Sequence, residues 1–115
     1  EKMKLHEFSK DLNIRNKWIY ERKINVYIRR SSRIIGTLRL PCLDLATVEV
    51  DENYRGQGIF TKFLIRFEKL AKNENRVVFV ENIMNERLKT FLLSNGYKYH
   101  QTSNEFSVCL VKILK

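Results

Sequence analysis

The first half of the chain contains short apolar runs with the alternation typical of β-strands. The runs at 24–30 and 34–40 are rich in β-branched and aromatic residues and flank the polar residues 31–33, which predicts a β-hairpin turning at those residues. Pro41 is expected to end the second strand because proline cannot donate a backbone hydrogen bond. The run at 45–50 predicts a third strand.

Three segments have helical spacing. A weakly amphipathic pattern predicts a first helix over 9–21, with its buried residues expected at Leu12, Trp18 and Ile19. A second helix is predicted by apolar residues at 60, 63, 64, 67 and 71, and it should end near 73–75. A third helix should begin near Asn85 and end at Gly96, since glycine adopts the left-handed conformation that often terminates helices.

The remaining apolar runs complete a sheet. Residues 76–80 are continuously apolar after Arg76, which predicts a central strand buried on both faces. Two further strands, near 97–101 and 105–114, are expected to form a closing hairpin. The predicted class is therefore α+β, with a mixed and mostly antiparallel sheet, one βαβ unit and flanking helices.

Chain length limits the number of domains, and the distribution of charge bears on the kind of partner. A chain of 115 residues fits one domain, predicted to span 1–115. Its formal charge is +9, and residues 1–40 contain eleven basic against four acidic side chains, with Arg29, Arg30 and Arg33 clustered. This excess is either ordinary solvation or attraction to an acidic partner, and the sequence leaves both interpretations open.

Several classes of protein are not expected. No apolar run approaches the roughly 20 residues of a membrane span, and the first ten residues lack a signal-peptide core, so a cytoplasmic protein with no membrane partner is predicted. Cys42 and Cys109 are too few for a disulfide framework, and without a CxxC pair no metal site is predicted.

The segment "ENYRGQGIFTKFL", residues 52–64, places two glycines between a predicted strand and a predicted helix. In this arrangement free backbone N–H groups and a helix N-terminus can bind an anion. A P-loop is excluded because the segment lacks a GKS or GKT ending. A dinucleotide fingerprint is disfavoured because Thr61 replaces its third small residue, although Glu81 resembles the ribose-binding acid of that fold.

A third ligand is coenzyme A. The stretch "VEVDENYRGQGIF" resembles the acyl-CoA loop of the GNAT-type N-acetyltransferases, whose pattern is R/Q-x-x-G-x-G/A. Arg55 and Gly58 match this pattern, whereas Phe60 departs from it. A second block, "NERLKTFLLSNGY", is similar to the family's segment of Asn, short helix and Gly-Phe, with Asn85 and Gly96 matching in position. The resemblance covers roughly residues 24–100.

The resemblance implies a GNAT fold and acetyl-CoA as cosubstrate. The backbone of the third strand would pair with the pantetheine amides, and the N–H groups of the bend would surround the pyrophosphate. The implied cofactor-binding residues are Val48, Val50, Arg55, Gly56, Gln57, Gly58, Ile59, Phe60 and Asn85. The alternatives are that Arg55 is a solvated surface residue and that Asn85 only caps its helix.

Acetyl transfer to an amine requires a proton acceptor, usually a carboxylate. Asp44 is the first candidate, since it precedes Val50 by six residues, about 20 Å of strand. Glu49 and Glu81 are the reserves, and a turn role for Asp44 is the alternative. Leu92 occupies the position where the family commonly has a tyrosine that protonates the leaving thiolate, and Tyr97 or Tyr99 could substitute for it.

The predicted function is acetyl transfer from acetyl-CoA to a primary amine, for example a protein lysine or N-terminus on an acidic surface. One alternative is a catalytically silent GNAT-fold module that binds coenzyme A or a partner. Another is a basic nucleic-acid-binding domain, which is less favoured because no known motif is present and the aromatic residues are expected in the core. The sequence leaves monomer and homodimer open.

Overall fold

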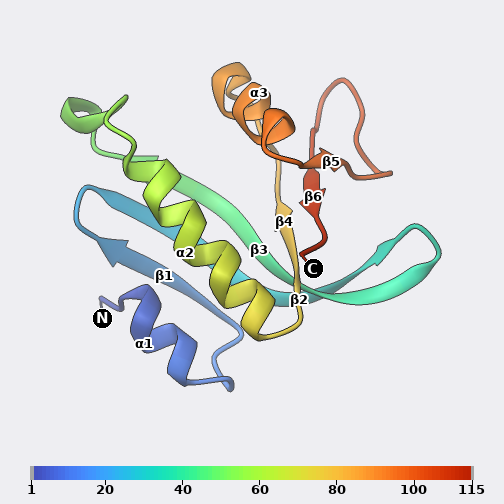
Figure 1. The fold of residues 1–115 in the computed structure, drawn as a ribbon, viewed down its shortest axis with the longest axis horizontal. Helices are drawn as coiled ribbons and strands as arrows, with labels where there is room; N and C mark the ends of the chain where they lie inside the picture. Colours follow the sequence, from blue (N-terminus) through green and yellow to red (C-terminus); the bar gives the residue numbers. More distant parts are fainter. Residues whose placement is uncertain (1, 115) are drawn as a thin grey trace.

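A computed structural model describes residues 2–114 (Figure 1). The elements follow the order α1 (Leu5–Lys10), β1 (Asn16–Glu21), β2 (Ile24–Ile35), β3 (Leu38–Val50), the 3-10 turn η1 (Glu52–Tyr54), α2 (Ile59–Asn73), β4 (Val77–Val80), α3 (Glu86–Ser94), β5 (Lys98–Tyr99) and β6 (Leu110–Lys112). The described strands form one sheet in the order β1-β2-β3-β4-β6-β5. Only β3 and β4 pair in parallel, which confirms the predicted α+β class with a mixed, mostly antiparallel sheet.

One face of the sheet carries the main core. The helices α1, α2 and α3 all contribute apolar side chains to the same cluster, and alternate residues of the strands pack against them. The buried strand residues of this cluster are Ile19, Ile24, Val26, Ile28, Leu43, Leu45, Val78, Val80 and Leu110. The opposite face has a smaller cluster around Cys42 and Phe79, to which no helix within residues 2–114 contributes.

The strand β3 has different neighbours along its two edges. It pairs with β2 along its whole length, but with β4 only from Cys42 to Leu45. The register with β2 shifts at the same point, so Ala46 is an extra residue between Leu45 and Thr47. A bulge of this kind bends a strand and increases its twist. Beyond Leu45, β3 and the chain that follows β4 therefore separate.

The prediction of a helix over 9–21 is wrong. The helix α1 ends at Lys10, and residues 16–21 form the edge strand β1. Ile19 is buried as expected and pairs with Val26, but Leu12 is 63% exposed and Trp18 is only half-buried. The alternation of Lys17, Trp18, Ile19 and Tyr20 therefore has the period of a strand, and burial of Ile19 on the core face turns Trp18 to the other face.

The predicted position of the first hairpin is also wrong. Residues 31–33 lie within β2, and the chain turns at Gly36 and Thr37. Pro41 lies inside β3, which also contains the strand predicted at 45–50. Pairing with β4 begins only at Cys42, so at residue 41 one edge of β3 has no neighbouring strand and the missing N–H is tolerated.

The other predicted elements are confirmed in type. The helices α2 and α3 and the central strand β4 occupy their expected positions, and every residue of β4 is buried. The closing hairpin exists as β5 and β6, but these strands are much shorter than predicted. No helix among residues 2–114 has the length and apolar character needed to cross a membrane.

Arg30 connects the N-terminal segment to the sheet and to α2. Its guanidinium is fully buried, pairs through two nitrogens with Glu74 (2.9 and 2.8 Å), and donates to the carbonyl oxygens of Phe8, Asp11 and Ile14. Burial alone would raise the pKa of Glu74, but the hydrogen bonds and charges of Arg30 and Arg76 hold it below its ordinary value. The predicted cluster of three arginines is therefore partly a structural feature.

Replacement of Arg30 by methionine should destabilise the fold. Arg30→Met leaves Glu74 and three carbonyl groups without their buried donor, so the free energy of unfolding should fall by about 3 kcal/mol or more. Urea denaturation followed by circular dichroism measures this change. Arg39→Met is the control, since Arg39 is exposed and should change stability by less than about 0.5 kcal/mol. Equal effects of the two variants would contradict the assigned role of Arg30.

Candidate active site

The glycine bend joins β3 to α2. The turn η1 is capped by the Asp51 carboxylate, which accepts the Asn53 N–H (3.0 Å). Gly56 (φ +80°) and Gly58 (φ +76°) then adopt the left-handed conformation, which favours glycine. Gly58 is also the N-cap of α2 and offers no capping side chain. The first-turn N–H groups of α2, which have no intrahelical partner, are therefore available to an anion.

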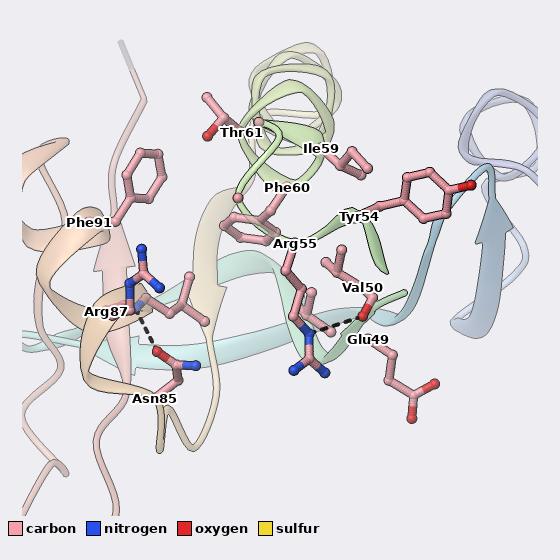
Figure 2. Close-up of a pocket in the computed structure, with 14 residues that line it drawn as sticks. Glu49, Val50, Tyr54, Arg55, Ile59, Phe60, Thr61, Asn85, Arg87 and Phe91 are labelled. Atoms are coloured by element: carbon pink, nitrogen blue, oxygen red, sulfur yellow. Dashed lines mark hydrogen bonds between the residues drawn. The ribbon is translucent and has the colours of Figure 1, made fainter. Parts of the chain in front are cut away.

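A cleft of about 560 Å³ opens beside this bend (Figure 2). Its walls are the end of β3, the bend, the first turn of α2 and the beginning of α3. All the predicted cofactor-binding residues line it except Gln57. Segments that are 30 residues apart in the sequence are thus brought together where β3 separates from the chain after β4.

Phe60, the departure from the family pattern, forms part of the cleft wall. Its ring contacts Phe91 of α3 in an edge-to-face arrangement, with ring centroids 6.3 Å apart. The two rings lie across the cleft from α2 to α3 (Figure 2). The larger side chain therefore connects the two helices, a role that a glycine or alanine at this position could not fill.

Two arginines line the cleft. The Arg55 Nε donates to the carbonyl oxygen of Val50 (3.3 Å), which ties the bend to the end of β3. Arg87 is exposed on the first turn of α3 and faces the cleft from the other wall. Sequence reasoning missed Arg87, whose only signal was its place two residues after Asn85. Together these cations make the cleft suited to an anionic ligand.

Asn85 lines the cleft and also caps its helix. Its Oδ1 accepts the backbone N–H of Leu88 (3.1 Å), the usual N-cap contact. Asn85 therefore caps its helix, as the alternative interpretation of the sequence proposed. Because Asn85 also lines the cleft, its side-chain amide nitrogen remains available to a ligand.

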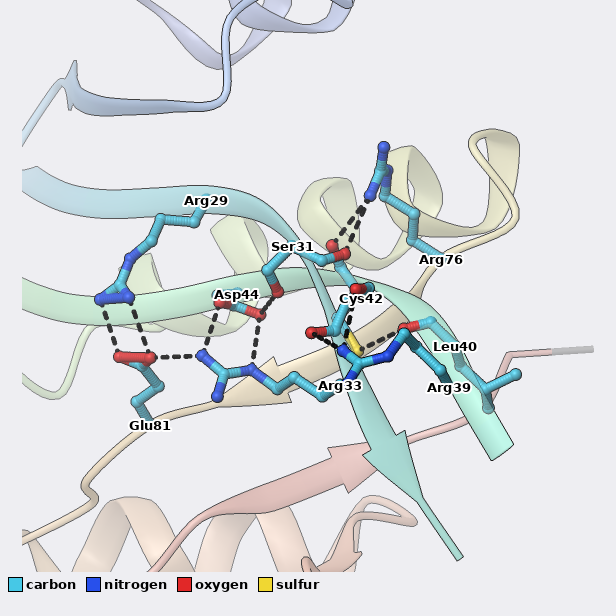
Figure 3. Close-up of polar contacts among 10 residues, drawn as sticks. Arg29, Ser31, Arg33, Arg39, Leu40, Cys42, Asp44, Arg76 and Glu81 are labelled. Carbon is cyan, nitrogen blue, oxygen red and sulfur yellow. Dashed lines mark hydrogen bonds and ion pairs between the residues drawn. The ribbon is translucent and has the colours of Figure 1, made fainter. Parts of the chain in front are cut away.

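The three predicted carboxylates have different surroundings; Figure 3 shows Asp44 and Glu81, and Figure 2 shows Glu49. Asp44 is fully buried, where it accepts from Ser31 Oγ (2.8 Å) and from Arg33 (2.8 Å). Glu81 pairs with Arg29 (2.9 Å) and Arg33 (2.6 Å), and its side chain is 19% exposed. Glu49 is exposed and is the only one of the three that lines the cleft. Asp44 does not open directly onto the cleft.

The chain following β4 places Glu81 at the closed end of the gap. Its backbone N–H donates to the carbonyl oxygen of Leu45 (3.1 Å), the last contact before β3 diverges. Partial burial alone would lower the pKa of Arg33. The hydrogen bond to Asp44 and the charges of Asp44 and Glu81 outweigh this effect, so the pKa of Arg33 is raised. Burial, reinforced by Asp44, raises the pKa of the neighbouring Cys42 thiol to about 11, so this thiol stays protonated at neutral pH.

Neither of the two tyrosines considered as substitutes for Leu92 lines the cleft. Leu92 is fully buried in the core. Burial and the carboxylate of Glu68, which accepts the Tyr97 hydroxyl (2.6 Å), raise the pKa of Tyr97 far above its ordinary value. Tyr99 is 54% exposed on β5 and does not line the cleft.

Comparisons with known proteins identify the fold. No protein-family model and no curated protein sequence matches this chain. Among solved structures, the KacTA–DNA complex matches with a TM-score of 0.58 and 22% identity, covering 76% of this chain and 56% of that chain. A mutant of the AtaT toxin, bound to the C-terminus of the antitoxin AtaR and acetyl-CoA, matches with a TM-score of 0.59 and 19% identity, covering 76% and 57%.

A second structure of the same AtaT mutant, bound to the antitoxin segment alone, has a TM-score of 0.61 at 19% identity. These neighbours have the GNAT fold, and the mixed sheet and flanking helices of this chain match it. The chain therefore has the GNAT fold, as the two sequence blocks predicted. It spans a little over half the length of the matched chains.

Proposed function

We propose that this protein is an N-acetyltransferase that uses acetyl-CoA as its cosubstrate. The observation that supports the proposal best is the cleft itself, which is lined by a helix N-terminus without a capping side chain, a glycine bend and two arginines. The solved AtaT neighbour holds acetyl-CoA and has the same fold, which supports the choice of ligand.

Residues of the cleft fit the pyrophosphate and the pantetheine arm of coenzyme A. The N–H groups at 56–60 and the guanidinium of Arg55 would bind its pyrophosphate. Beyond Leu45, the edge of β3 that faces away from β2 has no partner strand among residues 2–114. The free backbone groups at 48–50 would therefore pair with the pantetheine amides, as an added strand does. Bound acetyl-CoA supplies the activated thioester.

The proton chemistry is assigned to Glu81. Five residues separate Val50 from Leu45, about 17 Å of strand, which is comparable to the pantetheine arm. An arm bound at the bend and lying along β3 would therefore bring its thioester to the closed end of the gap, beside Glu81. Asp44 and Arg33 position this carboxylate, since Arg33 bridges both acids. Glu81 accepts the proton of the attacking amine, directly or through water.

The leaving thiolate needs no protein acid. A thiol pKa near 8.5 makes the thiolate a tolerable leaving group in water, so Leu92 at the usual tyrosine position is compatible with turnover. The acceptor is a primary amine. The basic excess of the first 40 residues favours an amine on an acidic surface, such as a protein lysine or N-terminus flanked by Asp and Glu.

Acetyl-CoA should bind at the glycine bend. A glutamate at residue 58 places a negative charge where the pyrophosphate would bind, so Gly58→Glu should weaken acetyl-CoA binding by about tenfold or more, which is about 1.4 kcal/mol. Gly58→Ala is the matched control, since it has the same backbone strain at φ +76° without the charge, and a Cβ there meets no atom within 4 Å. Calorimetry measures both affinities. Equal affinities would place the ligand elsewhere.

Turnover should depend on an amine. Free thiol is expected to be released from acetyl-CoA when acidic lysine peptides are supplied, and more slowly with basic peptides of equal length. A thiol reagent follows the release, with a protein blank to subtract Cys42 and Cys109. Binding without release on any amine would favour the silent coenzyme A-binding module instead. Absence of both binding and release would exclude both functions.

The proton acceptor can be separated from its neighbours by substitution. Glu81→Gln should lower kcat by roughly 10²-fold while leaving acetyl-CoA affinity unchanged, the usual scale for loss of a general base. Glu49→Gln, at the exposed wall of the same cleft, is the matched control and should retain most activity. Asp44→Asn should shift the pH profile of turnover rather than abolish it. If Glu49→Gln alone lowers kcat, Glu49 is the base.

A further inference from the structure

The sheet has an open aromatic surface on the side away from the helices, formed by Trp18, Tyr20 and Tyr27 of β1 and β2. Trp18 and Tyr27 are direct cross-strand partners, and their ring centroids lie 5.4 Å apart. Tyr20 stacks beside Trp18 at 6.2 Å. All three side chains are only half-buried, although the sequence led us to expect the aromatic residues in the core.

Cations surround these rings. Arg29 Cζ lies 5.6 Å from the Tyr27 ring centroid, and Lys2 Nζ lies 5.7 Å from that of Tyr20. A hollow of about 490 Å³ between the rings is also lined by Lys2 and Lys17, and no carboxylate within residues 2–114 lines it. Glu81 already pairs with Arg29, so the two lysines carry the unbalanced charge of this hollow.

The aromatic surface is separate from the cleft. The cleft is bounded by α2 and α3 on the side of the sheet that carries the main core, whereas the three rings project from the opposite side of β1 and β2. No α-helix among the described residues covers that side. A ligand on the aromatic surface would therefore leave the coenzyme A cleft itself free, while Arg29 connects the surface to Glu81.

We infer that the aromatic surface binds single-stranded nucleic acid. Flat, half-exposed rings offer stacking platforms for unpaired bases, and the adjacent lysines offer partners for the phosphates between them. A duplex would hide its bases from the rings. An acidic peptide would pair with the lysines but would leave the three rings without a flat partner. The combination of rings and cations therefore favours a single strand, which was the less favoured interpretation of the sequence.

The single tryptophan of the chain makes this surface measurable, because all tryptophan fluorescence comes from Trp18. The whole 115-residue protein is titrated with labelled dodecamers of deoxythymidine and of uridine, without acetyl-CoA. We expect saturable anisotropy, quenching of Trp18 with the same midpoint, and weaker binding as salt rises. The DNA and RNA arms show which of the two strands binds more tightly.

Variants and a matched ligand test the stacking. Tyr27→Leu should weaken dodecamer binding by about tenfold, ~1.4 kcal/mol, whereas Tyr99→Leu, at the opposite edge of the sheet, should not change it. Lys17→Gln, which carries little risk to folding, should reduce the salt dependence. An abasic dodecamer of equal charge should bind at least about tenfold more weakly than the base-containing strand.

Three outcomes would overturn the inference: equal binding of the abasic strand, equal affinity of the Tyr27 and Tyr99 variants, or no quenching of Trp18. Self-association of the protein that changes Trp18 fluorescence in the absence of nucleic acid would instead identify the occupant as a second copy. Nucleic-acid binding is measured without acetyl-CoA or an amine. A negative result in this experiment therefore does not contradict the proposed acetyl transfer, and absence of acetyl transfer would not contradict nucleic-acid binding.

Discussion

The separation of β3 from the chain after β4 is the constraint on which the rest of this structure depends. The parallel pairing stops at Leu45 and Val80, at the same point where Ala46 forms a bulge against β2. The bulge bends and twists β3 while β2 continues to hold its other edge. The gap that results has free backbone groups along one wall, a glycine bend at its open end and a cluster of charges at its closed end. Without this divergence the two strands would pair further, and no cleft would form.

The two ends of the gap are fixed by different kinds of interaction. At the open end, local backbone geometry is decisive, because left-handed glycines turn the chain directly into α2 and leave its first N–H groups free. At the closed end, side chains from β2, β3 and the loop after β4 meet in an ion-pair network. Arg33 bridges Asp44 and Glu81 there, and Arg29, four residues earlier on β2, also pairs with Glu81. Such a network holds its carboxylates in place, since each guanidinium contacts them in a fixed, planar geometry.

The basic first third of the chain has more than one role. Arg30 is buried in the structure, where its hydrogen bonds join α1, β2 and the end of α2. Arg29 and Arg33 neutralise the acids beside the gap. Among residues 2–114 no carboxylate lines the hollow of the aromatic surface, so its two lysines are a part of the excess that remains free for the proposed ligand. A formal charge of +9 therefore overstates the charge available to any one ligand.

The sequence by itself determined the class of fold, the glycine bend, the helices α2 and α3 and the central strand β4. These features depend on spacing and on residues with strong local preferences, such as Gly58, Asn85 and the continuous apolar run of β4. The sequence also pointed to nine of the fourteen residues that line the cleft, because two blocks occurred in the order of a known family. It missed Arg87, which has no local signature.

Only the tertiary structure decided the path of the N-terminal segment and the roles of its charged residues. Residues 16–21 became a strand because β2 was available as a partner, and pairing with a neighbour is invisible to a local pattern. The ion pairs of Arg30 with Glu74 and of Arg29 with Glu81 join residues 44 and 52 positions apart. Spacing along the chain could not predict that Asp44 would be buried beneath Arg33, or that Trp18 and Tyr27 would face away from the core, because both follow from which strands meet and on which side the helices pack.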